Sequence, residues 1–140
     1  MSEDRIGTAR SMVESFNAAD WGAYAAAHTP GAVYDEVGTS RRTEGIGEII
    51  ALLKGWRTGM PDVTGTVNNA STAGDSVVLE VTWQGNHTGP LAGPAGTIEA
   101  TGKSQTTRAA WIVEFDGGLI KETRHYFDML SFMQQLGQLP

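Results

Sequence analysis

Residues 111–127 read WIVEFDGGLIKETRHYF, and this stretch indicates a β-hairpin. Asp116, Gly117 and Gly118 are typical of a tight turn between two strands. The extended run before the turn reaches from about Ile98 to Phe115, and the run after it ends at Phe127. We therefore expect two long strands that pair in antiparallel fashion.

Further extended runs precede this hairpin. Two of them span roughly Val63 to Thr72 and Ser76 to Thr88, and Gly-Asp and Gly-Pro pairs separate the runs. A shorter strand is expected from Ala32 to Val37. Most of the second half of the chain is therefore predicted to be sheet.

Helical spacing of apolar residues marks the rest of the chain. Ile6, Ala9, Val13 and Phe16 recur at intervals of three and four, which predicts a first helix. A short second helix is expected over residues 21–27, before Pro30, and a third over residues 46–56. A C-terminal helix follows Asp128, which can cap it.

The order of these elements predicts an α+β fold, because strands and helices do not alternate as they do in a parallel α/β sheet. We expect a curved, mostly antiparallel sheet wrapped over the three helices of the first half, with a short helix at the C-terminus. The concave side of such a sheet forms a one-ended apolar pocket, which is the usual shape of a small-molecule site.

Composition limits the possible functions. The 140 residues are enough for one domain, and the net charge of −6 disfavours binding to nucleic acid. The chain has no cysteine, which excludes disulfides and thiol nucleophiles. No phosphate-binding loop or local metal motif is found, so we expect no cofactor. Without an apolar run of about 18 residues or a secretory signal, we expect a cytoplasmic protein that does not bind membranes.

Asp35 is the first candidate catalytic residue. Strand alternation groups it with Val33 and Val37, and burial on that apolar face would raise its pKa toward the range that is useful for proton transfer. Alternatively, Asp35 pairs with Arg41 or Arg42, or caps the turn at Val37-Gly38-Thr39.

His125 is the second candidate, because an imidazole near the end of the last strand could act as an acid or a base. Its strand parity groups it with Thr123 and Phe127, although a bulge at the preceding turn would reverse its facing. Asp128 could orient His125 or cap the following helix. His87 shares a strand face with Trp83, so both could lie at the mouth of the pocket.

The chain resembles the SnoaL-like polyketide cyclase family, within the broader fold of nuclear transport factor 2 and ketosteroid isomerase. The resemblance rests on a series of short motifs in order. They are Phe16-Asn17-Ala18-Ala19-Asp20-Trp21, Met60-Pro61-Asp62-Val63, Gly85-Asn86-His87-Thr88-Gly89-Pro90-Leu91, Ala100-Thr101-Gly102-Lys103, and the tail from Phe115 through Tyr126-Phe127-Asp128 to Gly137.

This resemblance implies a cone-shaped α+β barrel with a deep apolar pocket, commonly assembled as a homodimer or homotetramer through the outer sheet face. The isomerase segment that bears the general base is similar to residues 33–38, which assigns that role to Asp35. The catalytic aspartate of the cyclases falls on His125. The isomerase donors of the oxyanion hole fall near Met12 and near Ala109 or Ala110, which cannot donate a hydrogen bond through their side chains.

Together these observations predict an enzyme that binds a small, largely apolar carbonyl compound of polyketide type. Asp35 and His125 would move a proton at the carbon beside the carbonyl, in aldol ring closure or isomerisation. The alternative is a non-catalytic module that binds a hydrophobic ligand or assembles through its sheet, which the missing oxyanion donors favour. The candidate pocket walls are Tyr34, Trp56, Trp83, Trp111 and Tyr126, although Trp56 and Trp111 could equally belong to the ordinary core.

Overall fold

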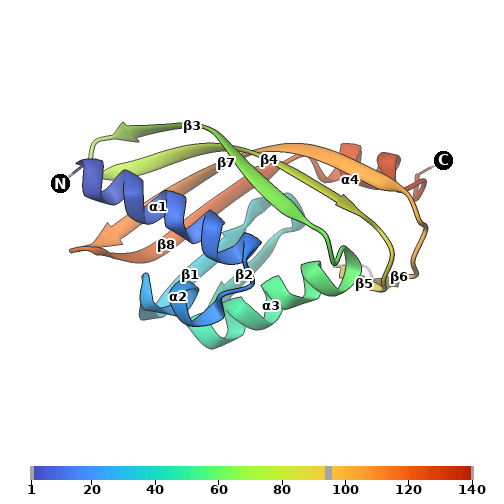
Figure 1. Cartoon of the computed structure of the whole chain (residues 1–140), viewed down its shortest axis with the longest axis horizontal. Coiled ribbons are helices and arrows are strands. Elements are labelled where there is room, and N and C mark those ends of the chain that lie inside the picture. The colour runs from blue at the N-terminus through green and yellow to red at the C-terminus, as the bar shows by residue number, and fades with distance from the viewer. Residues whose placement is uncertain (1, 94–95, 140) are drawn as a thin grey trace.

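The structure is a computed structural model that describes residues 2–93 and 96–139. Its main feature is a curved six-stranded sheet in the order β2-β1-β8-β7-β4-β3, with a separate two-stranded sheet formed by β5 and β6 (Figure 1). All neighbouring strands are antiparallel except the pair β1 and β8. The strands are β1 (His28–Glu36), β2 (Arg41–Glu44), β3 (Thr64–Ala73), β4 (Ser76–Asn86), β5 (Leu91–Gly93), β6 (Gly96–Ile98), β7 (Ser104–Asp116) and β8 (Leu119–Phe127).

In the described part of the chain, four α-helices and one short 3-10 helix accompany the sheet. The helices are α1 (Ser2–Asn17), α2 (Trp21–Ala26), α3 (Ile46–Gly59) and α4 (Met129–Gln135), with the 3-10 turn η1 (Val37–Thr39) between β1 and β2. The sheet curves over α1 and α3, and α4 lies beside the N-terminal part of β7 (Figure 1). The predicted α+β architecture is confirmed: a curved, unclosed sheet covers helices from the first half of the chain.

The predicted hairpin is confirmed. Strands β7 and β8 pair with Asp116 opposite Leu119, and Gly117 takes the positive φ of 61° that such a turn needs. Burial along β7 alternates residue by residue, so one face of this strand packs on the core. Met12, Phe16, Tyr24, Leu53, Leu79 and Trp111 are among the buried side chains that fill the space between sheet and helices.

The sequence-based prediction of the strands was wrong in several places: β5 was not predicted, and Val37, expected to end a strand, belongs to η1. Residues 98–115 do not form one continuous strand: β6 ends at Ile98, β7 begins at Ser104, and Gly102 in between has a φ of 72°. Strand β2 was missed because only four residues, held by their pairing with β1, make it up. Short strands of this kind depend on their partner, and their local sequence carries little signal.

None of the helices within residues 2–93 and 96–139 combines the length and the apolarity that crossing a membrane requires.

Candidate active site

A pocket lies on the concave side of the sheet. Its empty volume is about 530 Å³, including the part that is open to solvent. Apolar and aromatic side chains dominate the wall, and five polar residues interrupt it: Tyr34, Glu36, Gln105, Thr107 and His125. The complete lining is Phe16, Tyr34, Glu36, Leu53, Trp56, Met60, Val63, Trp83, Gln105, Thr107, Trp111, His125, Phe127 and Phe132.

Strand β1 presents the opposite face from the one that its sequence suggested. Tyr34 and Glu36 are buried and line the pocket, whereas Asp35 is only partly buried and does not line it. The two valines beside Asp35 were expected to face the core, but the larger tyrosine takes that side instead. The predicted facing of Asp35 is therefore wrong, and Glu36 is the carboxylate in the pocket.

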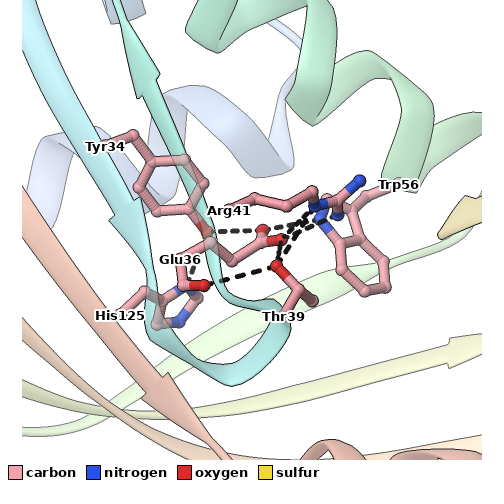
Figure 2. A network of polar contacts seen from close by, with 6 residues as sticks. All are labelled: Tyr34, Glu36, Thr39, Arg41, Trp56 and His125. Atoms are coloured by element: carbon pink, nitrogen blue, oxygen red, sulfur yellow. Dashed lines mark hydrogen bonds and ion pairs between the residues drawn. The ribbon is translucent and has the colours of Figure 1, made fainter. Parts of the chain in front are cut away.

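Glu36 is fully buried and accepts hydrogen bonds from four side chains (Figure 2). Its Oε1 atom accepts hydrogen bonds from Thr39 Oγ1 at 2.5 Å and from two nitrogens of Arg41, Nη2 at 2.7 Å and Nε at 3.1 Å. Its Oε2 atom receives Tyr34 Oη and Trp56 Nε1, both at 2.9 Å. A buried carboxylate is tolerated when it is paired and hydrogen-bonded, and here both oxygens are saturated with donors.

His125 lies in the middle of the sheet, next to this carboxylate. Its Cα partner on β1 is Glu36, and its partner on β7 is Trp111. The imidazole stacks on the Trp111 ring, with centroids 4.2 Å apart. Its Nδ1 atom lies 2.8 Å from Tyr34 Oη, and its Nε2 atom accepts from Trp83 Nε1 at 3.1 Å. The side chains of His125, Tyr34 and Glu36 thus form one continuous chain of polar contacts (Figure 2).

Burial controls the protonation of this chain. It lowers the pKa of His125 to about 4, while the negative charge of Glu36 acts in the opposite direction. The imidazole is therefore neutral near pH 7. Burial, followed by the charge of Glu36, raises the pKa of Tyr34 well above its usual value, so the phenol keeps its proton.

The structure places four of the five predicted wall residues in the pocket lining and leaves the fifth outside it. Tyr34, Trp56, Trp83 and Trp111 line it. Tyr126 is 41 % exposed and does not line it, because its parity on β8 is opposite to that of His125.

His87 is fully buried outside this lining. Its Nδ1 atom lies 2.9 Å from Thr101 Oγ1 and accepts from the Thr101 backbone N–H at 3.3 Å. These contacts tie the end of β4 to the loop before β7. The predicted place of His87 at the pocket mouth is therefore not what the structure shows.

Asp128 caps helix α4 and does not line the pocket. Its carboxylate accepts from the backbone N–H of Ser131 at 3.0 Å. We expect Asp128→Ala to lower the free energy of unfolding by about 1 kcal/mol, because a helix N-terminus loses its side-chain acceptor. Asp128→Asn, which keeps an acceptor oxygen, is the control in urea unfolding and should retain most of the stability. Equal losses in the two variants would contradict the capping role.

Sequence reasoning missed Glu36, Gln105 and Thr107. Glu36 had one available signal, since an arginine follows it at position 41 and could reach it across a turn. Gln105 and Thr107 alternate with exposed residues on β7, and their hydrogen bond of 2.6 Å joins Thr107 Oγ1 to Gln105 Oε1. Within the part of the chain that the structure describes, no three His, Asp or Glu side chains are clustered to hold a metal ion.

Comparisons with known proteins agree with this architecture. The family model for SnoaL-like polyketide cyclases matches residues 7–136. A protein from Jannaschia sp. CCS1, provisionally assigned as a SnoaL-like polyketide cyclase, is 21% identical with a TM-score of 0.87, over 99% of this chain and 94% of that one. No curated protein matches the sequence at a significant level.

Two further solved structures widen the comparison. AclR from Streptomyces galilaeus, provisionally assigned as a hydroxylase, is 22% identical with a TM-score of 0.82, over 100% of this chain and 99% of that one. A protein of ketosteroid isomerase-like fold from Catenulispora acidiphila, in complex with trimethylamine, is 17% identical with a TM-score of 0.78, over 95% and 93% of the two chains. At these identities the likenesses concern the fold. Because the family model spans nearly the whole chain, the protein belongs to the SnoaL-like polyketide cyclase family.

Proposed function

We propose that this protein binds a small, largely apolar carbonyl compound and uses His125 to remove a proton from the carbon beside the carbonyl. The observation that carries the proposal is the buried chain from His125 through Tyr34 to Glu36 in the wall of an apolar pocket. A neutral imidazole can accept a proton, and the nearby carboxylate stabilises the positive charge that then forms.

The basicity of His125 limits the class of substrate. A pKa of about 4 makes the imidazole a weak base, and proton transfer is efficient only when acid and base are matched. A weak base of this kind favours a substrate proton that is comparatively acidic, such as one on a carbon between two carbonyl groups. Such a carbon is the nucleophile of an aldol ring closure, which fits the family to which the chain belongs.

Trp111 is the candidate donor to the substrate oxygen. Its indole Nε1 is buried and has no hydrogen-bond partner among residues 2–93 and 96–139, and the residue lines the pocket beside His125. A buried donor without a partner is costly, and a ligand oxygen would remove that cost. This donor would take the role that Met12 and Ala109 cannot fill.

Proton exchange at carbon tests the proposal without knowledge of the natural substrate. We would incubate the protein in D₂O with ethyl 2-benzyl-3-oxobutanoate, which has an aromatic group and one proton between two carbonyls, and follow that proton by NMR. We expect His125→Gln to slow the catalysed exchange by about 10²-fold or more, the usual contribution of a general base. Glutamine keeps one donor and one acceptor for Tyr34 and Trp83 but has no basic nitrogen.

Asp35→Asn is the matched control. It also replaces one ionisable side chain by an amide, next to Glu36 on the same strand but outside the pocket lining. It should leave exchange unchanged. If the folded wild-type protein binds the probe and does not accelerate exchange above buffer, catalysis on this substrate class is contradicted, and the protein is then better described as a binding module.

A further inference from the structure

Trp83 makes a polar contact that its role as a pocket wall does not explain. The residue lies on β4, and its indole N–H points edge-on at the imidazole of His125, with ring centroids 5.8 Å apart and planes at 65°. The Nε1 to Nε2 distance is 3.1 Å. This is a hydrogen bond between two residues in the pocket lining, on the side of the imidazole away from Tyr34.

The indole of Trp83 can only donate, and this sets the donor and acceptor roles in the series of hydrogen bonds from Trp83 to Glu36. An indole N–H can only donate, so Nε2 of His125 must be the acceptor and carries no proton. A neutral imidazole then carries its proton on Nδ1, and this proton can be donated to Tyr34 Oη at 2.8 Å. The Tyr34 hydroxyl donates in turn to Glu36 Oε2 at 2.9 Å. Every donor in the chain therefore points toward the carboxylate.

We infer that Trp83 is a positioning residue that holds His125 as the Nδ1–H tautomer and covers its basic Nε2 atom until a ligand displaces the indole. The group that replaces the indole must itself offer a proton, from an O–H or from an acidic C–H. A ligand with only acceptor oxygens gains nothing at this position. The catalytic meaning of this inference rests on the proposed function, but the tautomer and the hydrogen bond do not.

Close neighbours pack against the six-membered ring of this indole. Gly65 on β3 is its cross-strand partner, and a Cβ atom at position 65 would come within 2.6 Å of the Trp83 ring. Asn17 fixes Gly65 by donating to its carbonyl and accepting from its N–H, both at 2.8 Å. Phe16 packs edge-on against the same indole, with centroids 5.3 Å apart.

The titratable and charged groups around His125 come from two strands. Tyr34 and Glu36 belong to β1, and Arg41 of β2 pairs with Glu36 at 2.7 Å. The neighbours from β4 and β7 are uncharged, namely Trp83 and Trp111. A donor to neutral Nε2 opposes its protonation, so the Trp83 hydrogen bond should depress the basicity of His125.

The first test is the tautomer itself. Long-range ¹H–¹⁵N correlation spectra of the ligand-free protein at neutral pH distinguish Nδ1–H from Nε2–H imidazoles, and His125→Gln assigns the signal among the three histidines. We expect His125 as the Nδ1–H form. An Nε2–H form would overturn the inference, because Trp83 could not then donate to that nitrogen.

The second test compares two variants by NMR titration of His125. Trp83→Phe keeps an aromatic ring but removes the donor, and we expect the pKa of His125 to rise by about one unit. Trp111→Phe also replaces an indole by a phenyl ring, here on the face of the imidazole, but it removes no hydrogen bond that the described residues make. It should therefore shift the pKa of His125 much less. Equal shifts in the two variants would contradict the covering role of Trp83.

Gly65→Ala provides an independent variant in case Trp83→Phe does not fold. The added methyl group displaces the Trp83 ring but leaves the indole N–H in the protein. We therefore expect the pKa of His125 to rise in this variant as well. If the ring is displaced and the pKa of His125 is unchanged, the inference is contradicted. Both titrations use the protein without substrate. The proton-exchange experiment can therefore fail while this inference holds, and the reverse can also occur.

Discussion

Glu36→Gln should lower the free energy of unfolding by about 3 kcal/mol, the lower end of the cost of breaking a buried ion pair from one side. The amide has nearly the volume of the carboxylate, so no cavity forms. Its NH₂ group, however, must face either Thr39 and Arg41 or Tyr34 and Trp56, and all of these are donors to Glu36. Arg41 also loses the charge that it pairs with at 2.7 Å.

Denaturant unfolding measures this loss, and Asp35→Asn again provides the matched control. Asp35 lies one residue earlier on the opposite face of β1, where its Cα partners are Arg42 and Arg124. Partly exposed charges of this kind contribute little, so its loss should stay below about 1 kcal/mol. If the two variants lose equal stability, then Glu36 does not organise the site as described.

Acid should destabilise the protein through His125. The pKa of this group is about 4 in the folded state against 6.5 as its ordinary value, which the unfolded chain approximates. Between these values the unfolded chain binds a proton that the folded protein excludes. The contribution of His125 is complete above pH 6.5 and is lost as the pH falls toward 4, by about 3 kcal/mol in total.

Unfolding free energies measured from pH 7.5 down to pH 4 test this expectation in the wild type and in His125→Gln. The variant has no titrating group at position 125, so its stability should fall less steeply over the same range. Burial also lowers the pKa of His28, but that contribution is common to both proteins and cancels in the difference. Parallel curves would show that His125 titrates normally in the folded state.

Much of the fold follows from local sequence. The turn at Asp116–Gly118 needs residues that accept a tight reversal, and the apolar stripe over residues 46–56 needs a helix to face one side. Such signals depend only on neighbours a few positions apart. They predicted the helices, the hairpin of β7 and β8 and the α+β class, which the structure confirms, whereas the continuous strand expected over residues 98–115 is divided between β6 and β7.

The site was predicted only in part, because the pairing of distant strands decides which side chains of a strand point into the interior. Alternation on β1 separates Asp35 from Glu36 but does not say which face is buried. Local hydrophobicity predicted that the side with Val33, Asp35 and Val37 would be buried. The interior instead holds Tyr34 and Glu36, since Arg41, Thr39 and Trp56 converge to compensate a buried carboxylate.

The order and spacing of residues along the chain were enough to predict the class of fold and the family resemblance, and they supplied an imidazole at position 125. Which carboxylate connects to that imidazole through Tyr34, and which side chains face its two nitrogens, followed only from the three-dimensional arrangement of distant strands. Residues from β1, β4, β7 and β8 come together at His125, and their hydrogen bonds join positions up to 91 residues apart in the chain. Contacts of that range have no local signature, because only the folded chain brings their partners within bonding distance.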